Sequence, residues 1–411
     1  MNVLILAYAC EPLKGSEPGV GWNLSVELSK LHKVTVLTRR NNRQAIEDYM
    51  AEHPMGDIRF VYHDLPDRWM WIKRMLGVQA YYVLWNLTAR KVVKRLLKDS
   101  SIDVIHHLTF NQYRTPSVGY LIDRPFVIGP VGGAELINPV FDAELEPSTL
   151  KRENFRRKGR DRMLFRWLGQ RSHARKAFVF SAMENAVRLD DYIDKQRDIV
   201  KVLPAIAITE NDFMVESASE CGCRPFRMIY AGRALDWKGL HVFMVALAKA
   251  RQQLPEVKVL LIGVRDEKER QTVRIWIKEL SLDGCVELID FIPRSVLIKK
   301  LAEADLFVYP AFRDSGSMAV LEACALGCPS IAFDAGGQDA FPDDVIVKVK
   351  IGESLEDTVI AFSDQLVWAY QNQNSLKEYG KRAKAFAFSY MTWKYKAEQM
   401  TEIYNEVIKK V

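Results

Sequence analysis

The chain has 411 residues, which is too long for one hydrophobic core and predicts two domains. Its composition, 48% hydrophobic and 27% charged, is that of a globular protein and excludes disorder, collagen and coiled coil. The 58 Lys and Arg exceed the 52 Asp and Glu by six, and no apolar stretch approaches the ~20 residues that cross a bilayer.

The chain begins without the basic region of a signal peptide, and its six cysteines are scattered. They suggest neither a disulfide framework nor zinc knuckles. We therefore expect a protein of the reducing cytoplasm.

The first half alternates short apolar runs with stretches of helical periodicity. Residues 3–7 predict a strand, the glycine-rich loop 15–22 follows, and leucines at helical spacing lead to a second strand at 34–38. Further strands are expected at 58–62, 104–107, 126–131, 177–181 and 200–203. This order predicts a parallel, doubly wound α/β sheet.

The same pattern restarts after a polar join near 204–211. Strands are predicted at 227–232, 257–263, 285–289, 305–309, 329–333 and 345–349, with helices near 240–252, 266–280 and from 317. Residues 355–410 predict consecutive helices. Two such sheets bind ligands at the carboxyl ends of their strands, and we expect the site in the cleft between the domains.

The segment 314–329 is the most specific motif. Its loop and helix start offer free backbone amides from Gly316 through Ser317 and Met318 to Ala319, which suit a phosphate. Asp314 and Glu322 flank that anion site, and a carboxylate accepts two hydroxyl donors of a sugar. Alternatively, Asp314 caps a turn and Glu322 is a solvated helix residue.

Two cations in the loop after strand 227–232 favour the phosphate interpretation. Arg233 and Lys238 would stabilise the negative charge of a nucleoside diphosphate as its bond to the sugar breaks, so no metal is expected. The alternative is that Arg233 and Lys238 are exposed cations on the protein surface.

These motifs resemble glycosyltransferase family 4 of the GT-B fold, and the resemblance covers essentially the whole chain. It implies two Rossmann-like domains facing across a cleft, residues 1–205 for the acceptor and 206–389 for the donor. The last helix, about 390–411 with Trp393 and Tyr404, would cross back to the first domain.

The resemblance assigns roles residue by residue. Glu322 would hold the ribose hydroxyls, Asp314 the hydroxyls of the hexose, and Arg233 with Lys238 the diphosphate. Asp314 stands where the family has Glu and is one methylene shorter. Donor-binding positions are also implied at Gly15, Ser16, Gly21, Gly232, Phe291, Ile292, Gly316, Ser317, Met318 and Ala319.

A first-domain histidine is the remaining candidate. His107, near the end of strand 104–107, would orient the donor sugar or the acceptor hydroxyl, while the adjacent His106 points to the other sheet face. Alternation does not decide which of them lines the cleft, and a core role for both is the alternative. Family members retain anomeric configuration and need no enzyme nucleophile.

Two basic stretches carry the excess positive charge. Residues 68–98 hold eight Lys and Arg and no acid, and residues 151–176 hold eleven against two acids. Both contain aromatic side chains, a mixture that suits an anionic membrane surface. The alternative is that the cations form a solvated face while the aromatic side chains are buried. Binding of nucleic acid is not supported, because the sequence shows no known nucleic-acid-binding module.

Together these features predict a cytoplasmic, membrane-peripheral, metal-independent retaining hexosyltransferase. Its donor would be a nucleotide sugar, with UDP favoured and GDP-mannose as the second choice, and its acceptor a glycan or lipid-linked molecule of a bacterial surface polysaccharide or lipopolysaccharide pathway. Two alternatives remain. One is a non-catalytic nucleotide-sugar-binding or scaffold protein. The other is an NADP-dependent oxidoreductase, suggested by Gly19, Gly21 and the pair Arg39 and Arg40.

Overall fold

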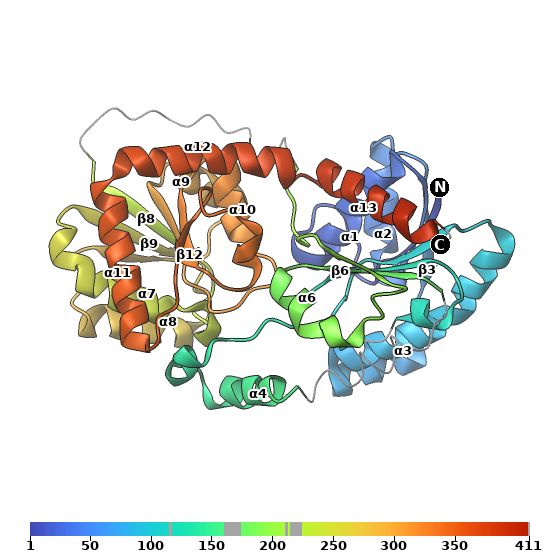
Figure 1. Ribbon diagram of the computed structural model, residues 1–411, viewed down its shortest axis with the longest axis horizontal. Coiled ribbons are helices and arrows are strands. Elements are labelled where there is room, and N and C mark those ends of the chain that lie inside the picture. Colours follow the sequence, from blue (N-terminus) through green and yellow to red (C-terminus); the bar gives the residue numbers. More distant parts are fainter. Residues whose placement is uncertain (115–116, 160–173, 210–212, 214–223, 410–411) are drawn as a thin grey trace. The chain divides into compact units, whose positions relative to one another are not determined.

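The computed structural model describes residues 1–114, 117–159, 174–209, 213 and 224–409 (Figure 1). The chain forms two compact units. The first comprises Met1–Ala134, Lys158–Ala205 and Trp393–Val411, and the second comprises Glu135–Arg157 and Ile206–Thr392.

The first unit is built on a parallel sheet of seven strands in the order β3-β2-β1-β4-β5-β6-β7. The strands are β1 (Asn2–Leu6), β2 (Lys33–Arg39), β3 (Ile58–His63), β4 (Val104–His107), β5 (Phe126–Val131), β6 (Lys176–Phe180) and β7 (Ile199–Val202). The helices are α1 (Ser16–Ser29), α2 (Arg43–Glu52), α3 (Met70–Asp99), α6 (Met183–Leu189) and α13 (Trp393–Ile408).

The strands of this sheet are short apolar runs because helices cover both of its faces. β1 pairs with β2 on one side and with β4 on the other, and Val3 lies opposite both Val34 and Val104. Gly21 lies within α1, and because it has no Cβ atom the helix can approach the loop after β1 closely. A Cβ atom on Gly21 would lie 2.1 Å from the carbonyl oxygen of Ala9.

The second unit holds a parallel sheet of six strands in the order β10-β9-β8-β11-β12-β13. The strands are β8 (Phe226–Ala231), β9 (Val257–Ile262), β10 (Val286–Ile289), β11 (Leu306–Tyr309), β12 (Ser330–Phe333) and β13 (Val347–Val349). The helices are α4 (Pro147–Arg157), α7 (Leu240–Ala250), α8 (Glu267–Glu279), α9 (Arg294–Ala302), α10 (Met318–Ala325), α11 (Leu355–Gln371) and α12 (Gln373–Tyr390).

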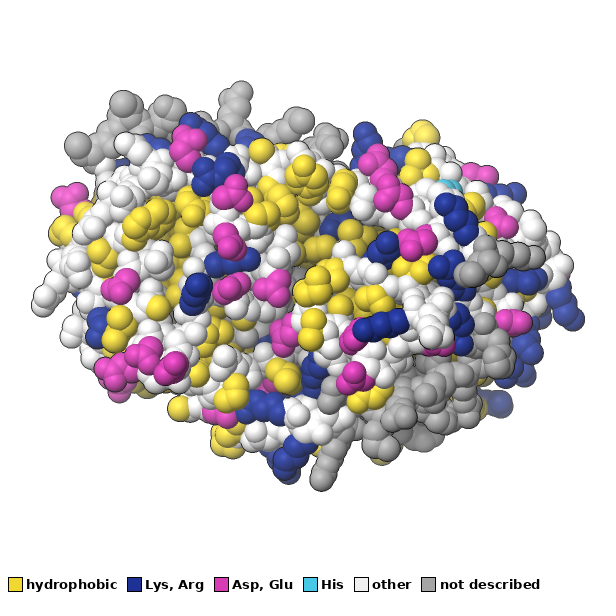
Figure 2. Space-filling model, viewed as in Figure 1, with side chains coloured by type: hydrophobic (Ala, Val, Ile, Leu, Met, Phe, Trp, Pro, Cys, Tyr) yellow, Lys and Arg dark blue, Asp and Glu magenta, His cyan; other side chains and the backbone are white. Residues whose placement is uncertain are grey.

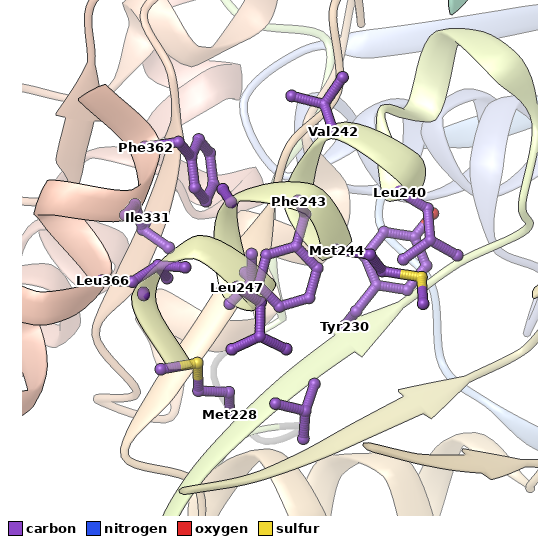
Figure 3. Packing of buried hydrophobic residues seen from close by; sticks show 14 of the residues in the cluster. Met228, Tyr230, Leu240, Val242, Phe243, Met244, Leu247, Ile331, Phe362 and Leu366 are labelled. Carbon is purple, nitrogen blue, oxygen red and sulfur yellow. The ribbon is translucent and has the colours of Figure 1, made fainter. Parts of the chain in front are cut away.

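One of the hydrophobic core clusters of the second unit lies between β8, α7 and α11. Met228 and Tyr230 of β8 pack against Phe243 and Leu247 of α7, and Phe362 of α11 closes the cluster (Figure 3). The predicted α/β architecture with two doubly wound sheets is confirmed.

One part of the expected domain division is wrong. The expected division places residues 135–157 in the first domain by their position in the chain, yet they pack with the second unit. The physical reason is that Ile137, Phe141 and Leu145 are buried in the hydrophobic core of that unit. The division at Ala205 and Ile206 coincides with the expected join.

The last helix belongs to the first unit, as the resemblance implied. The side chain of His32 in the first unit lies 2.8 Å from the hydroxyl of Thr401 in α13. Arg175 donates to the carbonyl oxygens of Glu406 and Lys409 at 3.0 Å each. Among the described residues no helix has both the length and the apolar character of a membrane-spanning segment.

Candidate functional site

The loops with the predicted donor residues leave the carboxyl ends of β8 and β11. These strands are neighbours at the centre of the second sheet, and the chain runs outward from them in opposite directions. Such a reversal leaves a crevice at the carboxyl edge where α/β sheets bind ligands.

Lys238 and Asp314 meet at this edge. Lys238 Nζ donates to Asp314 Oδ2 at 2.7 Å and to the hydroxyl of Tyr309 at 2.9 Å. Gly239, which follows Lys238, has a φ of +65°, and a Cβ there would lie 2.0 Å from the carbonyl oxygen of Pro310. Only glycine brings the two loops this close.

The Asp314 carboxylate is held by further donors. The hydroxyl of Tyr309 donates to Oδ2, and the amide of Gly316 donates to Oδ1 at 3.1 Å. Burial and the Asp314 carboxylate raise the pKa of Tyr309 well above its ordinary value, so its phenol keeps the proton that it donates. Asp314 is therefore a fixed part of the site, and Tyr309 is a component that the sequence interpretation missed.

The start of α10 offers fewer free amides than predicted. Besides the amide of Gly316, that of Met318 is also used internally, donating to the carbonyl oxygen of Gly316 at 2.8 Å. Within the described part of the chain, the amides of Ser317 and Ala319 donate to no protein acceptor. The hydroxyl of Ser317 is buried and likewise has no partner there. The prediction of four free amides is thus corrected to two, because the loop turns back on itself before the helix.

Arg233 is held by an acid on the neighbouring helix. Its Nη2 lies 2.6 Å from Glu269 Oε1, and the other oxygen of Glu269 accepts from the amide of Ala234 at 3.1 Å. The Arg233 side chain is half exposed, whereas Glu269 is mostly buried. Gly232, just before it, donates its amide to the carbonyl oxygen of Ile262.

Glu322 lies one turn into α10 and pairs with a cation from α9. Its Oε1 accepts from Arg294 Nε at 2.9 Å. Glu269 and Arg294 were not singled out by the sequence interpretation. The signal for them was their place in the first turns of α8 and α9, which follow β9 and β10 at the same edge of the sheet.

Phe291 lies in the turn between β10 and α9. Its ring is 56% exposed, and the guanidinium carbon of Arg265 lies 3.7 Å from its centroid. Ile292 beside it is partly buried. An exposed aromatic ring backed by a guanidinium is a surface on which a planar base can stack.

In the first unit, Gly15 precedes α1 as its N-cap and Ser16 opens the helix with a φ of +56°. The space over the Cα atom of Gly15 is open, so the helix start is accessible to a ligand. Gly21, by contrast, packs against the backbone of Ala9 and has a structural role.

The structure buries both candidate histidines. His106 Nδ1 lies 2.6 Å from the hydroxyl of Tyr404 and its Nε2 lies 2.9 Å from the carbonyl oxygen of Gly129. His107 is 2% exposed, with Nε2 at 2.8 Å from the hydroxyl of Tyr82 and 3.0 Å from the carbonyl oxygen of Thr109. Burial lowers the pKa of His106 to about 4 and that of His107 to about 3. Nδ1 of His107 has no partner in the described chain.

Arg39, one of the two arginines suggested for a 2′-phosphate, is not available to bind one. The Arg39 side chain is buried, its Nη2 lies 3.2 Å from Asp64 Oδ2, and its guanidinium stacks on Tyr8 and Tyr81. This ion pair is structural.

The basic stretch 68–98 forms most of α3. The aromatic residues Tyr81, Tyr82 and Trp85 face the core, which corrects their assignment to a membrane surface. Met75, Val78 and Leu87 are exposed. The exposed cations are Arg68, Arg74, Arg90, Lys91, Lys94, Arg95 and Lys98. Lys and Arg side chains gather over the part of the first unit that holds α3 (Figure 2).

The second basic stretch, 151–176, lies mainly outside the described residues, since 160–173 are not described. Of its described part, Glu153 and Arg156 are buried.

Comparison with known proteins gives a family match within the second unit. Residues 223–386 match the family model of the glycosyl transferases group 1. The D-inositol 3-phosphate glycosyltransferase of Paenarthrobacter aurescens (strain TC1) is 26% identical over 201 residues, which cover 48% of each chain. The amylovoran biosynthesis glycosyltransferase AmsK of Erwinia amylovora is 31% identical over 120 residues, 28% of this chain and 29% of its own. The match thus spans about half or less of these relatives' length.

Among solved structures, the Anabaena protein Alr3699/HepE in complex with UDP and glucose superposes with a TM-score of 0.60 at 16% identity, covering 99% of this chain and 100% of its own. This likeness shows the two-domain fold, known as GT-B.

Proposed function

Because residues 223–386 match the family model of the glycosyl transferases group 1, we propose that the chain transfers a hexose from a nucleoside diphosphate sugar. A UDP-sugar is the favoured donor and GDP-mannose the second. The observation that carries this proposal is the contact of Lys238 with Asp314 beside the open amides of α10, with Glu322 one turn further on.

The charges of the site match the parts of such a donor. Lys238 and Arg233 would bind the diphosphate, and the amides of Ser317 and Ala319 would add two hydrogen bonds to its oxygens. Glu322 would accept the ribose hydroxyls, and Asp314 the hydroxyls of the hexose. Phe291 would stack on the base. HepE, which shares the fold, was crystallised with UDP.

Each of these charges is paired within the protein itself: Lys238 with Asp314, Arg233 with Glu269, and Glu322 with Arg294. A donor would therefore exchange one set of ion pairs for another rather than bind to bare charges. The internal ion pairs hold the cations in place before the diphosphate arrives, and this reduces the reorganisation needed for binding.

The proposed reaction retains the anomeric configuration. The bond between the anomeric carbon and the diphosphate oxygen breaks, and a bond to the acceptor hydroxyl oxygen forms on the same face of the sugar. The proton of that hydroxyl passes to a phosphate oxygen of the leaving nucleoside diphosphate. Lys238 and Arg233 stabilise the negative charge that develops there, so no enzyme nucleophile and no divalent metal are needed.

We further propose a glycan or lipid-linked acceptor in bacterial surface polysaccharide synthesis. AmsK of Erwinia amylovora acts in amylovoran biosynthesis, which supports this pathway class. The exposed cations of α3 support docking on the anionic cytoplasmic leaflet.

The proposal is tested by calorimetric titration with UDP-glucose, UDP-N-acetylglucosamine and GDP-mannose, followed by assays of nucleoside diphosphate release. We expect one of these donors to bind and turn over, with release unchanged by EDTA. Absence of binding by all three would overturn the donor assignment. Binding without release in the presence of candidate acceptors would favour a non-catalytic binding protein. Stabilisation by NADP alone would favour the oxidoreductase.

A matched pair of ligands tests Glu322. We expect Glu322→Gln to weaken UDP by about tenfold, the value of a charge-assisted hydrogen bond, and to leave 2′,3′-dideoxy-UDP unchanged. An equal effect on both nucleotides would show that Glu322 does not contact the ribose.

A further inference from the structure

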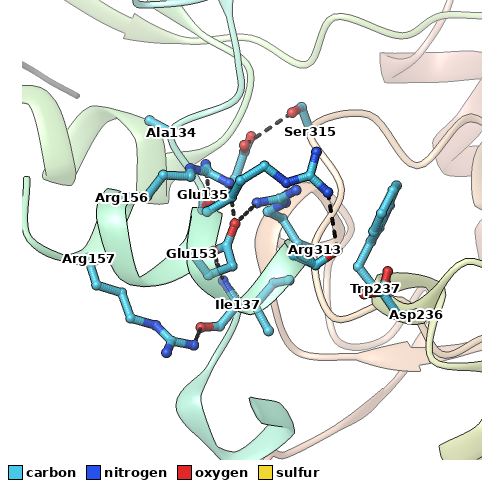
Figure 4. Close-up of polar contacts among 12 residues, drawn as sticks. Ala134, Glu135, Ile137, Glu153, Arg156, Arg157, Asp236, Trp237, Arg313 and Ser315 are labelled. Atoms are coloured by element: carbon cyan, nitrogen blue, oxygen red, sulfur yellow. Dashed lines mark hydrogen bonds and ion pairs between the residues drawn. The ribbon is translucent and has the colours of Figure 1, made fainter. Parts of the chain in front are cut away.

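The segment Glu135–Arg157, hereafter the strap, follows β5 in the chain and belongs to the second unit. Figure 4 shows its polar contacts. Glu153, which lies in α4 near the end of the strap, is 1% exposed. Its carboxylate accepts from Arg156 Nη1 at 2.7 Å, from the amide of Ile137 at 3.1 Å and from Arg313 Nη1. The first two contacts fold the strap upon itself, and the third fastens it to the loop after β11.

A second buried carboxylate of the strap holds the same loop. Glu135 is 1% exposed, and its Oε2 accepts from the hydroxyl of Ser315 at 3.1 Å. Arg313 and Ser315 are the two neighbours of Asp314 in the chain. The strap therefore holds the loop on both sides of the carboxylate that contacts Lys238.

The strap also contacts the loop that carries Lys238. The amide of Glu146 donates to Asp236 Oδ2 at 2.9 Å, and Glu144 Oε2 lies 2.7 Å from His241 Nδ1 at the start of α7. Between these contacts, Phe141 stacks on Phe312 with ring centroids 3.9 Å apart and planes 9° from parallel. One segment thus contacts both loops that form the candidate site.

We propose that the strap is a positioning element of the donor site, with Glu153 and Glu135 as its positioning residues. It holds the loops of residues 232–239 and 312–317 in the arrangement that brings Lys238 to Asp314. The proposal rests on the proposed function, because only that function supplies a donor for these loops to bind. A buried carboxylate needs hydrogen-bond partners, and this requirement fixes the position of each partner.

The test compares Glu153→Gln with a matched control in the same unit. Asp305 pairs with Arg224 at 2.7 Å and lies just before the amino end of β11, away from both loops. Asp305→Asn therefore removes a carboxylate from an arginine pair without touching the strap. Hydrogen exchange of the ligand-free protein would be followed in peptides that cover 232–239, 312–317 and, as a folding check, β8.

We expect Glu153→Gln to speed exchange in both loops and to leave β8 as in the wild type. UDP affinity should fall by about tenfold, because misplaced binding groups lose much of their effect. Asp305→Asn should leave loop exchange and UDP affinity unchanged. Unchanged loop exchange in a folded Glu153→Gln protein, or equal changes in the control, would overturn the proposal.

The buried Glu153 site carries a risk of unfolding when its charge is removed. Ser315→Ala is the milder variant, because it removes one hydroxyl and leaves the Arg313 contact intact. We expect faster exchange confined to 312–317, and if Glu153→Gln does not fold this variant decides the question. Failure of the wild-type protein to bind any nucleotide would overturn the proposed function but not the exchange result, so the two failures are distinguishable.

Discussion

The hydroxyl of Tyr404 lies 2.6 Å from Nδ1 of His106, and 298 positions of sequence separate the two residues. Nε2 of His106 faces the carbonyl oxygen of Gly129 and must donate to it, so Nδ1 accepts from the tyrosine. The ring is therefore neutral, and it joins α13 to β4. This contact is one of several that hold the last helix on the first unit.

The neutral rings of His106 and His107 predict a loss of stability in acid. Their pKa values are about 4 and about 3 in the folded protein, against 6.5 in an exposed histidine. Below pH 6.5 the unfolded chain binds protons that the folded chain does not, so stability falls as the pH falls toward 4. Each histidine should cost about 2 kcal/mol between pH 7 and pH 5.

Chemical denaturation at the two pH values measures this difference. His106→Gln should reduce it by about 2 kcal/mol, because the substituted side chain does not titrate. His53→Gln, at an exposed position, is the control and should leave the difference unchanged. If His106→Gln kept the full pH dependence, the histidine would not be the neutral buried group described.

The contact of Lys238 with Asp314 predicts separate effects on binding and stability. Lys238→Met should weaken UDP by about 10- to 100-fold, since a charge-assisted contact is lost, and should also destabilise the protein by leaving Asp314 unpaired. Adding Asp314→Asn should restore stability but not UDP affinity. Lys258→Met, at an exposed position on β9, is the control. Recovery of UDP affinity in the double variant would remove Lys238 from the binding site.

We expect that position 239 does not tolerate even the methyl group of an alanine. Its φ of +65° costs an alanine about 1–2 kcal/mol, and the added Cβ would also collide with the carbonyl oxygen of Pro310. Gly239→Ala should therefore lower the melting temperature by several degrees. Gly284→Ala is the control, because a Cβ there meets open space. Equal melting temperatures for both variants would contradict the close approach of the two loops.

The exposed face of α3 predicts salt-sensitive membrane binding. The protein should sediment with vesicles containing phosphatidylserine at low salt and be released as the ionic strength rises. Lys91→Glu with Lys94→Glu should abolish sedimentation. The same charge change at Lys377 and Lys384, exposed on α12, should leave it intact. Equal loss in both variants would indicate a response to net charge rather than to this helix.

Local signals in the sequence were sufficient for the strands and for the loops that carry Arg233, Lys238 and Asp314. Apolar runs and glycine positions depend on nearby residues, so they can be recognised without the fold. The partners of these charges could not be predicted in this way. Glu269 and Arg294 come to the site through the order of the strands, which the sequence does not state.

The strap shows a second limit. Glu153 lies in a basic stretch that favoured a solvated or membrane-facing surface, yet it is buried against Arg313, 160 positions later in the chain. In α3, helical spacing alone did not decide that Tyr81, Tyr82 and Trp85 face inward. Burial of charged and aromatic residues depends on which distant segment covers them.

The strap has a consequence for dissecting or recombining this protein. The chain passes between its two halves four times, after residues 134, 157, 205 and 392. A fragment cut at 206–392 would lack Phe141, Glu135 and Glu153, so Phe312 and Arg313 would lose their contacts with the strap. A hybrid protein that borrows the second unit must therefore also include residues 135–157, which an exchange at the midpoint of the chain would leave behind.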